Sequence, residues 1–111
     1  MQYLANINII NNKNKLIETE IDIMMPNKTT IEFKNINDHY NQKILDKIMF
    51  QMNKQIQCLQ EINNNFNNHH TVIFTDNIIN QNKFDDFIYN KELKNFHCFR
   101  DIQNIFNLIN I

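Results

Sequence analysis

Four histidines and two cysteines are among the side chains of this chain that could bind a metal ion or act as a nucleophile. His69 and His70 are adjacent in a polar stretch, which predicts exposed imidazoles in a loop. A closed zinc site is not expected, because such sites use ligand pairs at short spacing that this sequence lacks. His97 and Cys98 are also adjacent, but neighbouring strand residues point to opposite faces. We therefore expect no metal centre and no cysteine nucleophile, and we expect Cys58 and Cys98 to be buried thiols.

Two groups of basic side chains are candidates for binding. Lys43, Lys47 and Lys54 are spaced so that they lie near one another on a helix, where a small basic strip could meet phosphates or an acidic partner. The alternative is an ordinary solvated helix face. If His69 and His70 flank an interface, their protonation near a pKa of ~6.5 would make binding sensitive to pH.

Aromatic side chains crowd the last third of the chain, Phe84 and Phe87 among them. Nine Phe without Trp is a heavy aromatic content for 111 residues. Aromatic residues on a nearly neutral chain suit a protein interface better than a nucleic-acid groove. Phe84 and Phe87 are therefore candidate binding residues, and the alternative is that they fill the core.

The net charge of -1 gives no overall attraction to nucleic acid or to a membrane surface. No apolar run approaches the ~20 residues of a membrane span, and the first residues lack the features of a signal peptide, so we expect a cytoplasmic protein without membrane contact. The 23 Asn and 20 Ile indicate an A/T-rich genome, such as that of a phage, another virus, a bacterium or a protist.

The chain contains no glycine. This excludes glycine-rich phosphate loops and dinucleotide-binding turns in their usual form, so we expect no nucleotide cofactor. Turn positions that require a positive φ are then expected to be filled by asparagine, which tolerates them best among the remaining residues.

A long amphipathic helix is predicted between Asn37 and Asn65. Asn37 or Asp38 is its expected cap, and the Asn-rich run from Asn63 is its expected end. Its apolar residues recur at steps of three and four and form one stripe. The stripe consists of Ile44, Leu45, Ile48, Met49, Met52, Ile56, Leu59, Ile62 and Phe66.

Alternation of apolar and polar residues predicts three antiparallel strands at 3–10, 17–23 and 30–34. They leave one apolar face, which the long helix is expected to cover. The unbroken apolar run at 71–75 predicts a central strand buried on both faces. A helix at 82–90, a strand at 96–99 and a final helix that Asp101 caps follow. The apolar stripe of that last helix would be Ile102, Ile105, Phe106 and Ile109.

These elements predict one α/β (α+β) domain over residues 1–111. Its architecture is a three-stranded antiparallel meander, a long central helix, and then strand, helix, strand and helix in a mixed five-stranded sheet. Strands joined through helices run parallel, which sets the second half of the sheet.

This order resembles the ribonuclease H-like fold. Locally, Thr75, Asp76 and Asn77, followed by Phe84 and Phe87, look like the integrase-type core, in which an acidic residue ends a strand before an Asn and a helix with phenylalanines. The resemblance implies clustered carboxylates that hold two divalent ions about 4 Å apart.

The resemblance assigns Asp76 to such a site, with Asp46 and Asp101 as further acids that match no motif. The sequence departs from the family where the first strand should carry an acid, since Asn6 and Asn8 are neutral there. A scaffold without catalysis is therefore expected ahead of a nuclease.

Two functions remain open at this point. The first is a non-enzymatic interaction protein that docks on another protein or on a second copy of itself, as an accessory or inhibitory protein. The second is a metal-dependent nuclease or integrase remnant, or a domain that binds nucleic acid without cutting it.

Overall fold

The computed structural model describes residues 4–10, 18–26, 28–63, 68–101, 103–104 and 107. In chain order its elements are β1 (Leu4–Ile10), β2 (Glu18–Met24), β3 (Thr30–Asn35), α1 (Gln42–Ile62), β4 (His69–Phe74), α2 (Ile78–Asn90) and β5 (Phe96–Phe99). The strands form one sheet in the order β1-β2-β3-β4-β5. β1, β2 and β3 are antiparallel, whereas β3, β4 and β5 run parallel. The predicted class and element order are thereby confirmed.

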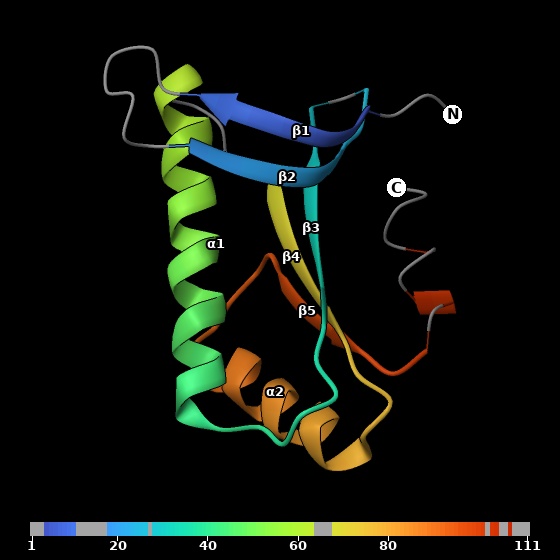
Figure 1. The fold of residues 1–111 in the computed structure, drawn as a ribbon. Helices are drawn as coiled ribbons and strands as arrows, with labels where there is room; N and C mark the ends of the chain where they lie inside the picture. The colour runs from blue at the N-terminus through green and yellow to red at the C-terminus, as the bar shows by residue number, and fades with distance from the viewer. Residues whose placement is uncertain are drawn as a thin grey trace.

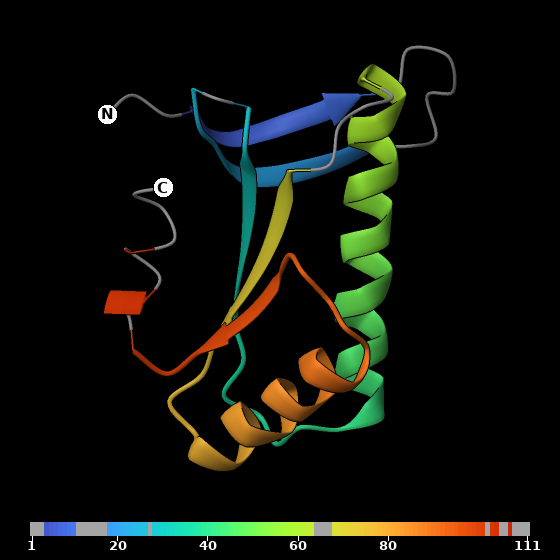
Figure 2. The same cartoon turned by 180° about the vertical axis from the view of Figure 1, so that it is seen from behind.

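Both helices pack on the same face of the sheet (Figures 1 and 2). The apolar stripe of α1 meets side chains from α2, β4 and β5 there, because burying each large apolar side chain contributes about 1.5–3 kcal/mol. The buried members of this core are Leu45, Ile48, Met52, Ile73, Phe84, Phe96 and Cys98.

The β1–β2 hairpin turns away from the other three strands and crosses the C-terminal half of α1 (Figure 1). Ile9 and Ile21 of the hairpin pack there against Cys58 and Leu59 of α1. Because β2 turns away from β3 together with β1, it pairs with β3 at two positions, both at the start of β3. The second half of β3 therefore runs on without β2 beside it.

The start of α1 differs from the prediction. Its N-cap is Asn41, so the predicted cap at Asn37 or Asp38 is wrong. The preceding segment is held by α2 instead, because Nδ2 of Asn80 donates to the carbonyl of Asp38 (2.6 Å) and Oδ1 of Asn80 accepts from the N–H of Tyr40 (2.9 Å). These bonds fix the backbone of 38–40 outside the helix.

Asparagines mark the end of α1 and the start of α2. α1 ends at Ile62, where the Asn-rich stop was predicted. α2 begins one turn before the predicted residue 82, because Oδ1 of Asn77 accepts hydrogen bonds from the N–H groups of Ile79 (2.9 Å) and Asn80 (3.3 Å). In the described part of the chain, neither helix is long and apolar enough to span a bilayer.

The apolar side chains of β3 face away from α1, which corrects the prediction that the long helix covers them. Ile31 and Phe33 lie with Val72 on the opposite face of the sheet. Thr30 and Glu32, the polar partners in the alternation, are buried on the α1 side. A period of two separates the faces of a strand, but it does not say which face a following helix covers.

The apolar stripe of the predicted last helix, Ile102, Ile105, Phe106 and Ile109, lies outside the described residues, whereas Gln103, Asn104 and Asn107 of the same segment are described and helical. Its expected cap is visible in part, since Oδ1 of Asp101 accepts from the N–H of Gln103 (2.8 Å), as an N-cap residue does.

Positive φ angles occur at Asn6, Lys28 and Glu92 in the described residues, so asparagine does not supply all such positions. Glu92 follows the end of α2 in a Schellman motif, in which the N–H of Leu93 donates to the carbonyl of Ile88 (3.1 Å). This position favours glycine, because a Cβ is strained at positive φ.

We expect Glu92→Gly to raise the free energy of unfolding by about 0.5–1 kcal/mol, because glycine removes the strain of the left-handed backbone. Urea denaturation measures the change. Lys91→Gly is the matched control and should destabilise, because Lys91 has right-handed helical angles that glycine does not favour. Equal effects of the two substitutions would contradict this account of the helix end.

Candidate functional site

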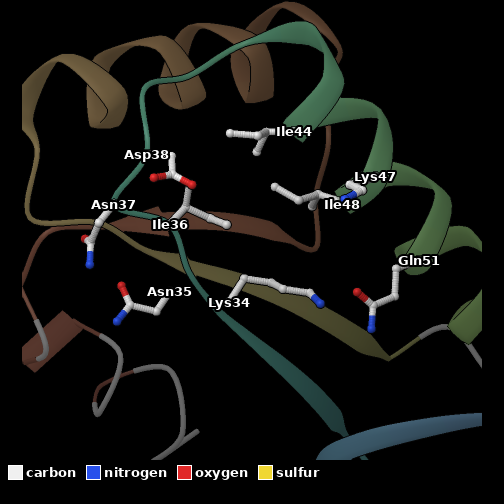
Figure 3. A pocket seen from close by; sticks show the side chains of 9 residues that line it. All are labelled: Lys34, Asn35, Ile36, Asn37, Asp38, Ile44, Lys47, Ile48 and Gln51. Atoms are coloured by element: carbon white, nitrogen blue, oxygen red, sulfur yellow. The ribbon is translucent and has the colours of Figure 1, made fainter.

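An open pocket of about 460 Å³ lies between the end of β3 and the first half of α1 (Figure 3). It exists because β2 leaves β3 after two residue pairs, so the edge of the helix–sheet sandwich is uncovered there. The residues that line it are Lys34, Asn35, Ile36, Asn37, Asp38, Ile44, Lys47, Ile48 and Gln51.

The two ends of the pocket differ in chemistry (Figure 3). Lys34 extends from β3 towards α1, where Lys47 and Gln51 border the same end. Asn37 and Asp38 border the other end. Isoleucine side chains lie between the two ends, so the pocket suits a group with an apolar body and an anionic end.

The outward side of α1 continues this basic character. Lys43, Lys47, Phe50 and Lys54 follow one another at steps of four, three and four, which places them on one stripe. Phe50 has 73% of its surface exposed, an unusual state for so large an apolar side chain. Together with Lys34, these four residues are called the basic face below.

Acidic residues near the basic face do not cancel its charge. Asp46 neighbours the stripe, and its Oδ1 accepts from Nε2 of Gln42 (2.8 Å). Asp38 borders the far end of the pocket. Glu32 also interacts electrostatically with Lys34. The four lysines still outnumber Asp38, Asp46 and Glu32, so the local charge is positive although the whole chain carries -1.

A buried polar cluster joins α1 to the sheet through Gln55. Oε1 of Gln55 accepts from Nε2 of His69 (3.1 Å), and Nε2 of Gln55 donates to Oε2 of Glu32 (2.5 Å) and to the carbonyl of Glu20 (3.0 Å). Nδ1 of His69 then accepts from the hydroxyl of Thr30 (2.8 Å). The cluster satisfies polar groups that would otherwise be costly to bury.

The environment of this cluster shifts two pKa values. Burial, and after it a hydrogen bond with Asp22, raises the pKa of Glu32 to about 7. Burial, and after it the neighbouring His70, lowers the pKa of His69 to about 4. Near neutral pH His69 is therefore an uncharged imidazole. His69 also borders a smaller pocket of about 240 Å³. Both ring nitrogens of His69 are already hydrogen-bonded to Thr30 and Gln55, so neither is open to a ligand in that pocket.

The prediction that His69 and His70 are exposed loop residues is wrong. β4 begins at His69, which is buried, and His70 is half-buried on the opposite face of the sheet. Nδ1 of His70 lies 3.0 Å from Nε2 of His97 on β5. Burial lowers the pKa of both rings, that of His97 to about 4 with a further contribution from His70.

Phe84 and Phe87 belong to the core, which corrects their assignment as binding residues. Phe84 is fully buried and packs edge to face on Tyr40, with ring centroids 4.9 Å apart. Phe87 is half-buried and meets Phe96 at 6.3 Å. Their helical spacing arose from packing, as the alternative interpretation held.

Asp76, which the resemblance assigns to a metal site, and the two further candidate acids Asp46 and Asp101 lie on different parts of the fold. Asp46 is on α1, Asp76 follows β4, Asp101 follows β5, and all three are exposed. Within the described residues, no three or more His, Cys, Asp or Glu side chains come together as a metal site. β2 and β3 lie between β1 and β4 in the sheet, so residues of the first strand are not neighbours of Asp76.

Both cysteines are free and buried, as predicted. Cys98 faces the helix-covered core, whereas His97 next to it faces the other side of the sheet. Burial, and after it Asp85, raises the pKa of the Cys98 thiol to about 12, so that it is not a thiolate at neutral pH.

Sequence reasoning found Lys43, Lys47 and Lys54 but missed Lys34 and Phe50. Phe50 was detectable, because it interrupts the polar side of the helix pattern between Lys47 and Lys54. Lys34 was not, since its place beside α1 depends on which face of β3 the helix covers and on where β2 leaves the sheet.

Comparison of the chain with protein-family models, with curated proteins and with solved structures gives no match.

Proposed function

We propose that this protein is a non-enzymatic interaction module that binds an acidic segment of another protein through the basic face. The observation that carries this proposal is the exposed ring of Phe50 between Lys47 and Lys54 on α1, where Lys47 also borders the open pocket together with Lys34. Exposed aromatic side chains are typical anchors of protein interfaces, and surrounding charges select and steer the partner. Two free thiols suit the reducing compartment of a cytoplasmic accessory or inhibitory protein.

Photo-crosslinking in cells of the native source tests this proposal. A benzoylphenylalanine at position 50 should crosslink to one protein at an Asp- or Glu-rich segment. The same group at position 89 is the control, because Tyr89 is more exposed still but lies on α2. It should not crosslink to that segment.

The crosslinked segment, made as a peptide, should bind the purified protein in calorimetry. Lys47→Glu should weaken this binding at least tenfold, because it puts a like charge beside the carboxylates. Crosslinks to nucleic acid, or equal crosslinking at positions 50 and 89, would contradict a protein-binding role of the basic face.

A further inference from the structure

The second half of β3 has an edge that no neighbouring strand covers in the described part of the sheet. β2 pairs with β3 at Thr30 and Ile31, and the next N–H on that edge, of Phe33, donates to the side-chain Oδ2 of Asp22 (2.8 Å). Asp22 thus ends the pairing with β2 by replacing a backbone acceptor. Beyond Phe33, this edge of β3 has no strand partner among the described residues.

Asn35 directs its main-chain groups to this edge. The N–H of Ile36 donates to the carbonyl of Phe74 on β4 (2.9 Å), so the main chain of Ile36 faces β4. Successive residues of a strand direct their N–H and C=O groups to opposite sides, as the ladder of hydrogen bonds requires. The N–H and C=O of Asn35 therefore face the side that β2 has left.

The same edge borders the pocket. Lys34 and Asn35 of β3 both line it, and Lys47 faces them from α1 (Figure 3). A chain added next to β3 would place alternate side chains into the pocket and out to solvent. Side chains directed inwards would meet the apolar isoleucines and then the ammonium groups of Lys34 and Lys47.

We propose that an extended acidic segment of a partner protein adds to β3 at Asn35 as a further strand and places a carboxylate near Lys34 and Lys47. This inference rests on the proposed function and specifies its mode of binding. In strand addition, main-chain hydrogen bonds give affinity and pockets for alternate side chains give specificity. Asp38 lies at the far end of the pocket and repels a carboxylate there, which fixes the end that receives the acid.

Charge argues against a second copy of this chain as the added strand. Lysines on an open edge oppose pairing between copies, because each copy would bring its own Lys34 and Lys47 to the shared edge. A partner that carries Asp or Glu on alternate residues brings no lysines to this edge, and its carboxylates are attracted to Lys34 and Lys47. The structure therefore favours a different, acidic chain.

Hydrogen exchange of the full chain, with an alternating peptide as probe, tests this mode. The probe is acetyl-(Val-Glu)₃-amide, and its control carries an N-methyl group on every residue, which keeps the charge but blocks strand pairing at both edges. With the probe at saturation, NMR should show at least tenfold slower exchange of the Asn35 amide. Lys34→Gln should weaken binding of the probe several-fold, because it removes a cation from the pocket.

Three results would overturn the inference. The first is equal binding of the N-methylated peptide, and the second is the absence of binding at millimolar concentration. The third is a dimer of the peptide-free protein in which Asn35 is already protected from exchange. The crosslinking experiment at position 50 is independent of all three, so strand addition can fail while the basic face is still found to bind a protein.

Discussion

Replacing Gln55 with alanine should lower the free energy of unfolding by roughly 3 kcal/mol or more. The side chain of Gln55 is fully buried and bonds His69, Glu32 and the carbonyl of Glu20. Its removal leaves an N–H and two acceptor groups in the interior without their partner, and each such group costs about 1–3 kcal/mol. Urea denaturation at pH 7, followed by circular dichroism, measures the loss.

Two further variants separate hydrogen bonding from packing. Gln57→Ala changes an exposed glutamine two residues away on α1 and should stay within about 0.5 kcal/mol of the wild type. Gln55→Leu retains most of the volume but none of the hydrogen bonds, so it should cost nearly as much as Gln55→Ala. A Gln55→Leu protein as stable as the wild type would show that volume, and not the polar cluster, stabilises this region.

The element order could be predicted because it depends on local patterns. Alternation over 17–23 and the apolar stripe of α1 reflect burial on one side, and the continuous apolar run at 71–75 reflects a strand covered on both. The start of α1 could not be predicted, because the bonds from Asn80 to Asp38 and Tyr40 join segments about forty residues apart.

The buried polar cluster could not be predicted for the same reason. Gln55 occurs in a helix with many polar residues, and nothing in its sequence position separates it from the exposed Gln57. Its burial follows from the position of β2 and β3 beneath α1. His69 was placed in a loop because the Asn-rich stretch before it is polar, whereas its partners Thr30 and Gln55 are distant in sequence.

The candidate site was predictable only in its helical part. The spacing of Lys43, Lys47 and Lys54 is a local property of one helix, and the structure leaves the first two exposed and the third half-buried. The pocket next to them depends on the departure of β2 from β3, which Asp22 marks through its bond to Phe33. The alternation of apolar and polar residues does not reveal that the side chain of Asp22 takes the place of a backbone acceptor.

The titration of Glu32 should make Glu32→Gln more stable than the wild type in alkaline solution. The pKa of Glu32 is about 7 in the folded protein against 4.5 for the ordinary carboxyl, chiefly because of burial. A carboxyl with a raised pKa contributes stability below pH 4.5, and this contribution is lost as the pH rises from 4.5 through 7. Glutamine mimics the protonated form and does not titrate.

At pH 8 we therefore expect Glu32→Gln to unfold with a free energy about 2–3 kcal/mol higher than the wild type, and at pH 4.5 we expect the two to be nearly equal. Chemical denaturation from pH 4 to 8 measures both curves. Asp86→Asn, which changes an exposed carboxyl on α2, is the control and should follow the wild type. A Glu32→Gln protein less stable than the wild type at pH 8 would mean that the ionised carboxylate is the stabilising form.

The same denaturation series on Glu32→Gln reveals the contribution of the buried histidines to stability. This contribution changes with pH in the direction opposite to that of Glu32. His69 and His97 have folded pKa values of about 4 against 6.5 for the ordinary imidazole, mainly because burial disfavours the charged ring. The stability that these uncharged rings contribute is fully present above pH 6.5 and is lost as the pH falls from 6.5 through 4. In the wild type Glu32 opposes this loss between pH 4.5 and 6.5. The Glu32→Gln protein should therefore lose stability more steeply than the wild type on acidification. The loss from His69 alone should be roughly 2–3 kcal/mol. A free energy of unfolding that does not change with pH would show that His69 is protonated inside the folded protein.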